Sequence, residues 1–242
     1  AAFIASNPST GAILSYQGGF NFSKSNFDRV RQSFPQAGSS FKPFIYSAAM
    51  ANGYKASDTI NDAPIIFEDQ NLESAWRPEN YTGKFYGPIR LREALVQSVN
   101  IVSIKLLREL GIDKAHTFLE NFGFPKSRLA PDLSLALGSS SFSPAEMIRA
   151  YNFLANSGEG QNLYFIEKII DKDNNIIFQH PHVQPELDDA KALDGFPWFA
   201  EELIEEIQPF NLLPKLNKKN TSIDSKIAFI TKDILREAIQ RG

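Results

Sequence analysis

The chain has 242 residues, of which 43% are hydrophobic and 22% are charged, values that are ordinary for a globular domain. This length is enough to bury a substantial core within one domain. A formal net charge of −3 gives no reason to expect a general nucleic-acid-binding surface. The absence of cysteine excludes disulfides and thiolate sites. No apolar run reaches the roughly 18 residues of a membrane span, so no transmembrane helix is predicted.

The N-terminal segment is predicted to form a hairpin followed by a polar loop. Residues 2–4 and 11–17 have the pattern of two strands, and the Asn-Pro-Ser-Thr-Gly turn between them carries strong Pro and Gly signals. A Gly-Gly pair ends the hairpin, and residues 21–37 are mostly polar. We therefore expect an antiparallel strand pair ahead of the first helix.

A serine and a lysine lie three residues apart where the first helix is expected to begin. A Gly-Ser start, a segment free of β-branched residues at 46–51 and the closing Gly53 frame this helix. The spacing places Ser39 and Lys42 on one helix face. Serine becomes a good nucleophile when a base lies within hydrogen-bond reach, and a partly buried lysine with a lowered pKa is such a base.

The residues beside this pair favour catalysis, although Ser-x-x-Lys by itself occurs by chance in many proteins. Gly38 allows close backbone approach, and Pro43 lies in the first helical turn, where a missing N–H costs little. A serine at a helix N-terminus also lies at the positive end of the helix dipole, which favours an oxyanion there. The segment therefore combines a nucleophile, a candidate base and electrophilic backbone.

Two helices at about 89–97 and 101–110 follow residues 54–88, whose many turn formers predict a mostly irregular segment. Between these helices, a Ser-x-Asn triplet can present a hydroxyl and an amide to a cleft. The alternative is that Ser98 caps the second helix and Asn100 binds a local backbone group. This alternative is the better interpretation of the triplet alone, but the serine–lysine pair upstream favours the cleft.

The second half of the chain is predicted to be helical first and loop-rich later. Helices are expected at 113–122 and 144–157, and a hairpin at 164–178. Repeated prolines divide residues 179–224, within which 199–207 has the spacing of a short surface helix with a solvated acidic face.

Other candidate sites have weaker support. His116 lies in an amphipathic segment and His180 and His182 flank a proline, which is weak evidence for a metal. Residues 171–175 begin like a calcium-binding loop, but the glycine and the final glutamate of such a loop are missing, so a hairpin turn is preferred. No glycine-rich nucleotide-binding motif is present. We therefore expect no metal or organic cofactor.

The two Ser-containing motifs and the segments around them resemble a known family. Ser39-x-x-Lys42 and Ser98-x-Asn100 match the first two motifs of penicillin-binding proteins and class A β-lactamases. The similarity is closest to the 1A type of the class A penicillin-binding proteins, the bifunctional peptidoglycan synthases. Four longer segments carry this similarity: 5–14, 38–44, 76–81 and 136–144.

The resemblance implies an α/β (α+β) architecture, namely the penicillin-binding and serine β-lactamase-like transpeptidase fold, with helices around an antiparallel sheet. Residues 1–242 would be one transpeptidase domain, and 179–224 its loop-rich and least similar part. The third motif of the family, Lys-Thr-Gly or Lys-Ser-Gly, is absent, and residues 225–236 resemble the helix that comes shortly before its strand. We therefore expect the domain to be incomplete at its C-terminus, truncated before the third-motif strand.

The resemblance also implies a D,D-transpeptidase that crosslinks peptidoglycan stem peptides through an acyl-enzyme formed on D-Ala-D-Ala. Ser39 would be the acylated nucleophile and Lys42 its base. Ser98 would pass a proton toward the leaving amine, while Asn100 would hold the donor's amide and help to position Lys42. Because β-lactam antibiotics resemble D-Ala-D-Ala, penicillin would acylate Ser39.

The family further implies a periplasmic or extracytoplasmic location at the inner membrane. A membrane anchor and a glycosyltransferase domain would lie upstream of residue 1, and stem peptides and β-lactams would be the binding partners, with no nucleic acid. Two alternatives remain open. One is a non-catalytic penicillin-recognising or interaction domain of the same fold. The other is a β-lactamase, which is disfavoured because no matching Glu-based deacylation loop is found.

Overall fold

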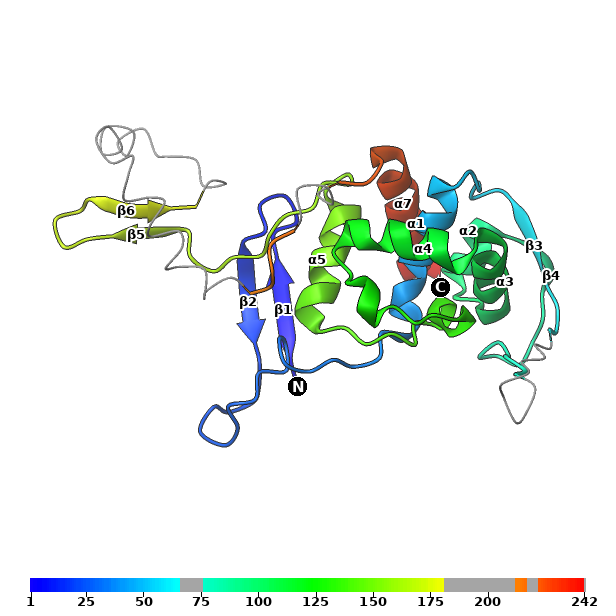
Figure 1. Cartoon of the computed structure of the whole chain (residues 1–242), viewed down its shortest axis with the longest axis horizontal. Helices are drawn as coiled ribbons and strands as arrows, with labels where there is room; N and C mark the ends of the chain where they lie inside the picture. The colour runs from blue at the N-terminus through cyan, green and yellow to red at the C-terminus, as the bar shows by residue number, and fades with distance from the viewer. Residues whose placement is uncertain (66–75, 181–211, 217–221, 242) are drawn as a thin grey trace.

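The computed structural model describes residues 1–65, 76–180, 212–216 and 222–241. Helices form the body of the molecule, and strand pairs lie at its sides (Figure 1). The central helix is α1 (Lys42–Ala51), which follows a 3₁₀ turn, η1 (Gly38–Phe41). Its residues are buried on every face from Lys42 to Ala49. A helix without a solvated face must be enclosed by its neighbours, so α1 forms the centre of the core.

The other helices pack around α1. Direct contacts are made by α2 (Leu91–Val96), α3 (Asn100–Leu110), α4 (Ile112–Leu119) and α7 (Ser225–Arg241). The helix α5 (Pro144–Ala155) meets α1 where the Tyr151 ring lies edge-on to Phe44. Short 3₁₀ turns join them: η2 (Glu120–Phe122), η3 (Lys126–Arg128) and η4 (Leu133–Leu137). The helix that begins near Ser39 and those predicted at 89–97, 101–110, 113–122 and 144–157 are confirmed, with 113–122 divided into α4 and η2.

A cluster of phenylalanines fills the core at the start of α1. Phe41 lies 5.1 Å from Phe124 and 5.6 Å from Phe142, measured between ring centroids, and Phe44 lies 4.9 Å from Phe122. All five rings are buried. Aromatic burial of this size contributes strongly to stability and leaves little rotational freedom. The cluster therefore fixes the turn that carries Ser39 and Lys42.

The strands form antiparallel pairs. In the described residues there are three two-stranded sheets: β1 (Phe3–Ser6) with β2 (Ile13–Gln17), β3 (Thr59–Asp62) with β4 (Gly87–Arg90), and β5 (Lys168–Ile170) with β6 (Ile176–Gln179). The first pair has a register shift at Ala5/Ser6, and the second runs from Thr59 opposite Arg90 to Asp62 opposite Gly87. The two predicted hairpins are confirmed.

The prediction that residues 54–88 are mostly irregular is wrong where β3 and β4 pair. Each strand has four residues, and β4 contains a Gly-Pro step that masks its strand pattern. This pairing is long-range, so no local signal reveals it. The surface helix predicted at 199–207 lies outside the described residues. Among the described helices, none is both long and apolar enough to cross a membrane.

Candidate active site around Lys42

Ser39 and Lys42 lie on the first turn of the central helix, but in different environments. The Ser39 carbonyl accepts the backbone N–H of Lys42, which closes the 3₁₀ turn. Ser39 is exposed, whereas Lys42 is 1% exposed and Phe41 between them is fully buried. In the described residues no hydrogen bond joins the Ser39 hydroxyl to the Lys42 ammonium. The structure therefore presents the serine to solvent one turn before the buried lysine.

A second segment supports this turn from behind. The Gly38 N–H donates to the Gly138 carbonyl over 2.9 Å, and the Ala37 N–H donates to the Ser140 carbonyl over 3.0 Å. Gly138 has φ +71°, and a Cβ there would lie 2.0 Å from the Gly38 oxygen. Only glycine fits that approach. Tyr151 also donates to the Ser40 carbonyl over 2.7 Å, so the backbone around Ser39 is held on two sides.

The Lys42 ammonium joins two residues that are far away in the sequence. Its Nζ lies 2.6 Å from the Ser98 carbonyl, 3.0 Å from the Ser98 hydroxyl and 2.7 Å from Asn100 Oδ1. An ammonium has three N–H donors, and these three oxygens can accept all of them. Burial lowers the pKa of Lys42 to about 8, well below the ordinary 10.5. The predicted residues Lys42, Ser98 and Asn100 are thus brought together.

Ser98 connects α2 to α3 in a conformation that is unusual for serine. Its φ of +54° is in the left-handed region, which costs a non-glycine residue about 1 kcal/mol or more. The conformation directs both its carbonyl and its hydroxyl toward Lys42. Ser98 does not cap the following helix: Val99 holds the N-cap position, and no side-chain cap bond is made there. The local capping alternative is therefore wrong for Ser98.

Asn80 is a residue of this site that the sequence patterns did not identify. Its side chain is buried, and its Oδ1 accepts the backbone N–H groups of Asn100 over 3.0 Å and Ile101 over 3.2 Å. These donors open α3 and have no intrahelical acceptor. No signal in the sequence indicates this role, because a helix predicted to begin at 101 has Asn100, a favoured N-cap residue, directly before it.

The chain and its fold match one family of known proteins. Over residues 1–242 the chain matches the family described as penicillin binding protein transpeptidase domain. This chain belongs to that family. The resemblance inferred from the two motifs is confirmed, as is the transpeptidase fold.

Relatives of this transpeptidase chain are penicillin-binding proteins 1A. It is 45% identical to that of Pseudomonas aeruginosa over 194 residues, which are 80% of this chain and 24% of the relative. It is 41% identical to that of Escherichia coli over 178 residues, 74% of this chain and 21% of the relative. The chain thus spans about a quarter of the length of the curated relatives it matches.

Solved structures agree with this assignment. The crystal structure of penicillin-binding protein 1A from Haemophilus influenzae matches with a TM-score of 0.80 and 32% identity. The match covers all of this chain and 35% of the Haemophilus influenzae chain. Penicillin-binding protein A from M. tuberculosis, solved as an imipenem acyl-enzyme complex, matches with a TM-score of 0.71 at 16% identity. That match covers 99% of this chain and 57% of the M. tuberculosis chain. At that identity the second structure supports the fold alone.

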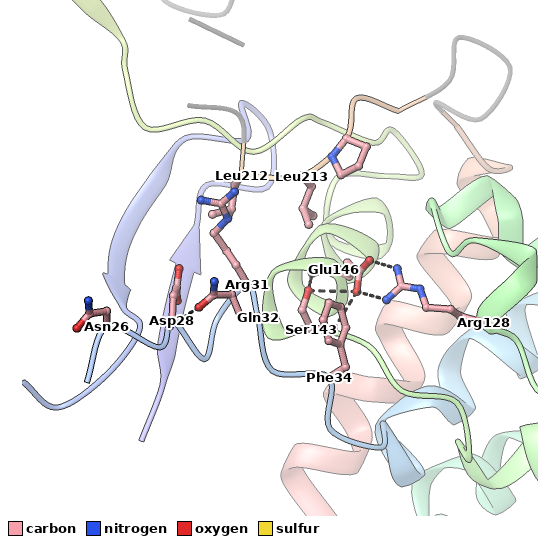
Figure 2. A pocket seen from close by; sticks show the side chains of 11 residues that line it. Asn26, Asp28, Arg31, Gln32, Phe34, Arg128, Ser143, Glu146, Leu212 and Leu213 are labelled. Carbon is pink, nitrogen blue, oxygen red and sulfur yellow. Dashed lines mark hydrogen bonds and ion pairs between the residues drawn. The ribbon is translucent and has the colours of Figure 1, made fainter. Parts of the chain in front are cut away.

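One pocket of the transpeptidase chain lies away from Lys42. It has a volume of about 560 Å³ and lies between the loop at 26–34 and the start of α5, with residues 212–214 lining its upper side (Figure 2). Arg128 is ion-paired with Glu146 at its wall, and Ser143 with Glu146 forms the capping box of α5. None of the four predicted site residues lines it. Arg128 and Ser143 on its wall are both bonded to Glu146, whereas two of the predicted site residues contact Lys42, so we place the chemistry there.

His116, His180 and the Asp171 turn lie outside the site. His116 is buried with its Nε2 2.9 Å from the Ala130 carbonyl, and His180 stacks on Tyr164 at 3.5 Å between ring centroids. His182 lies outside the described residues. The Asp171 carboxylate accepts two backbone N–H groups and one side-chain N–H of its own turn, which confirms the hairpin turn. Among the residues described, no group of three possible metal ligands occurs.

Proposed function

We propose that this chain is a D,D-transpeptidase domain that crosslinks peptidoglycan stem peptides through an acyl-enzyme on Ser39. The observation that carries the proposal is the Lys42 ammonium, which is buried and contacts Ser98 and Asn100. Burial lowers the pKa of Lys42 to about 8, so a useful fraction of the amine is neutral near physiological pH. Family membership and the similarity to penicillin-binding proteins 1A support the same reaction class.

The proposed first half-reaction forms an ester on Ser39. Its hydroxyl attacks the carbonyl between the two terminal D-Ala residues of a stem peptide, and neutral Lys42 takes the hydroxyl proton. The Ser39 N–H at the start of the helix would donate to the oxyanion. The C–N bond then breaks, and the Ser98 hydroxyl passes a proton from the Lys42 ammonium to the leaving D-Ala amine. Asn100 would hold the donor peptide's amide and keep Lys42 in place.

The second half-reaction releases the ester. An amine of a neighbouring stem peptide attacks the acyl carbon, its proton returns through the same groups, and Ser39 leaves as a hydroxyl. The products are a new amide crosslink and free enzyme, in ping-pong order. A strained β-lactam amide would acylate Ser39 in the same way. Penicillin-binding protein A of M. tuberculosis, which shares this fold, has been solved as acyl-enzymes of penicillin G and imipenem.

The proposal extends to the whole protein. We infer that the third-motif strand, with its oxyanion donor and the other wall of the cleft, follows Gly242, so that residues 1–242 are an incomplete transpeptidase domain. A glycosyltransferase domain and a membrane anchor would precede residue 1 and place the domain on the periplasmic side of the inner membrane. The similarity to penicillin-binding proteins 1A, of which this chain spans about a quarter, supports this arrangement.

A fluorescent penicillin tests the nucleophile in the full-length protein. We expect one covalent adduct, which mass spectrometry assigns to Ser39, and we expect Ser39→Ala to abolish it. Ser40→Ala is the matched control, because the neighbouring Ser40 hydroxyl is also exposed and only donates to the Ala37 carbonyl, over 2.6 Å. In this control the rate of adduct formation should stay within about threefold of the wild-type rate.

Two results would contradict parts of the proposal. An adduct that persists in Ser39→Ala would show that another residue is the nucleophile. An adduct on Ser39 without crosslinking of stem peptides would favour the alternative of a penicillin-recognising domain that does not turn over.

A further inference from the structure

We propose that Asp62 and Asn80 form a positioning pair that holds Asn100 against Lys42 and thereby sets the rate at which Ser39 is acylated. The proposal rests on the function proposed above, since it treats Lys42 as the base. In the described structure neither Asp62 nor Asn80 is hydrogen-bonded to the lysine. The pair acts through Asn100, so these are positioning residues.

The neighbours of the Asn80 amide allow only one orientation. Its Oδ1 faces the backbone N–H groups of Asn100 and Ile101 at 3.0 and 3.2 Å. Its Nδ2 lies 3.0 and 2.9 Å from the two carboxylate oxygens of Asp62 and 2.9 Å from the Lys84 carbonyl. Because backbone N–H groups only donate and a carboxylate only accepts, a reversed amide would lose all of these bonds.

Asp62 anchors this amide to the β3–β4 sheet. It is the last residue of β3, its side chain is fully buried, and it also accepts the Tyr86 N–H over 2.9 Å. On either side of it, Lys105 of α3 donates to the carbonyls of Asn61 and Ala63 over 2.7 and 3.1 Å. The buried Asp62 carboxylate is held rigidly, because any movement that broke its hydrogen bonds would leave buried polar groups unpaired at a cost in free energy.

The same segment also fixes the Asn100 side chain. Asn100 Nδ2 donates to the Glu79 carbonyl over 2.9 Å, which turns its Oδ1 toward Lys42 Nζ at 2.7 Å. Asn80 thus holds the backbone of Asn100 while Glu79 holds its amide. Removing the Asn80 contacts would free Asn100, and Lys42 would lose one of its three acceptors.

Variants of Asp62 and Asn80 can distinguish a positioning role from a general role in folding. In the full-length protein, Asn80→Ala removes the hydrogen bonds of the Asn80 amide, and Asn80→Asp places a second carboxylate opposite that of Asp62. The double variant Asp62→Asn/Asn80→Asp exchanges donor and acceptor at unchanged net charge. Its carboxylate at position 80 faces the α3 N-terminus, where negative charge is favoured. The matched control is Asn152→Ala, which removes another buried asparagine, 5% exposed against 6% for Asn80, whose side chain is hydrogen-bonded to Ser6 at the end of β1.

The first readout is acylation by penicillin, with the first-order rate at saturation separated from the apparent binding constant. We expect Asn80→Ala and Asn80→Asp to lower the first-order rate roughly tenfold to a hundredfold while binding changes little. The exchange variant should recover most of the rate. Asn152→Ala should lower the melting temperature but leave the rate unchanged. Equal losses in Asn152→Ala and Asn80→Ala at equal melting temperature would overturn the proposal.

A double-mutant cycle tests the route through Asn100. In an Asn100→Ala background, adding Asn80→Ala should cause little further loss of the acylation rate, because the contact it supports is already gone. Fully additive losses would overturn the positioning pair.

The last readout requires no reaction. Carbon NMR of labelled lysine side chains, with Lys42→Arg for assignment, follows the Lys42 titration. Asn100 Oδ1 accepts from the Lys42 ammonium at 2.7 Å and so favours its charged form. Displacing Asn100 in Asn80→Ala should therefore lower the midpoint below about 8, and the exchange variant should restore it. An unchanged midpoint in Asn80→Ala would refute the positioning pair. A wild-type protein without an adduct on Ser39 would instead refute the proposed function and the effect on acylation, and the titration would still decide whether the pair holds Asn100 against Lys42.

Discussion

At the residue scale, the chemistry proposed for this chain depends on a lysine that is kept out of water. Lys42 is 1% exposed, and its ammonium is surrounded by oxygens of Ser98 and Asn100. Desolvation disfavours the charged form and lowers the pKa of Lys42 to about 8. Burial therefore favours the neutral amine that the proposed mechanism needs, and the hydrogen-bond partners of Lys42 are oxygens of Ser98 and Asn100. The proposed nucleophile, Ser39, remains exposed.

We predict that the acylation rate rises with pH through about 8. The folded-state pKa of Lys42 is lowered to about 8, so the active neutral amine accumulates above that pH and is lost below it. At pH 7 a lysine of that pKa is about 10% neutral, against about 0.03% for an ordinary lysine. The pH–rate profile of penicillin acylation from pH 6 to 10 measures this. Lys42→Arg, which cannot deprotonate, should abolish the step. A wild-type rate that still rises about tenfold per pH unit between pH 9 and 10, as expected for an ordinary lysine of pKa 10.5, would contradict the prediction.

At the element scale, four backbone segments meet at the candidate site. The η1–α1 turn provides Ser39 and Lys42, the α2–α3 connection provides Ser98 and Asn100, the segment before β4 provides Asn80, and the turn after η4 supports Gly38 from behind. The Phe cluster holds the first of these segments in the core. Each element is short, so its position depends on its neighbours.

We predict that Gly138→Ala impairs acylation much more than a comparable glycine substitution elsewhere. The added Cβ would lie 2.0 Å from the Gly38 oxygen, and φ +71° would be strained in alanine. We expect a loss of about 2 kcal/mol or more in the free energy of unfolding and a clear fall in the acylation rate.

Gly53→Ala is the control for this substitution. It has a φ of +97° and open space around a Cβ, so it carries backbone strain without the clash. It should lower the melting temperature and leave the acylation rate near that of the wild type. Equal rates for both variants, measured with penicillin, would show that the Gly38–Gly138 contact does not place Ser39.

At the scale of the whole molecule, one buried helix organises the described chain. The central helix α1 is surrounded by α2, α3, α4 and α7, so both motifs are built on the same core. α7 is bonded to the core where Thr231 and Ser47 share a buried hydrogen bond of 2.9 Å. Arg92 of α2 also pairs with Asp233 and Glu237 of α7. The helix that would lead to the third motif is therefore docked in the described residues.

We predict that residues 1–242 alone are acylated by penicillin much more slowly than the full-length protein. The proposed third-motif strand would add the second oxyanion donor, and loss of one such donor costs roughly a hundredfold or more in rate. Stopped-flow acylation of both proteins measures the ratio, and circular dichroism verifies that the shorter chain is folded. Equal rates would show that the third strand is not needed for acylation.

Local sequence patterns were sufficient to predict much of this protein. Helix spacing, caps and turn residues depend on neighbours three or four positions apart, and they indicated α1, α3 and α5 and the two hairpins. The Ser39–Lys42 spacing and the Ser98–Asn100 triplet are local in the same sense, and together they indicated the family. Only the tertiary structure revealed the β3–β4 pair, the strained Ser98 and the part played by Asn80. The physical reason is that these features depend on hydrogen bonds and packing between segments some 20 to 60 residues apart, as in the contact of Lys42 with Ser98 across 56 positions.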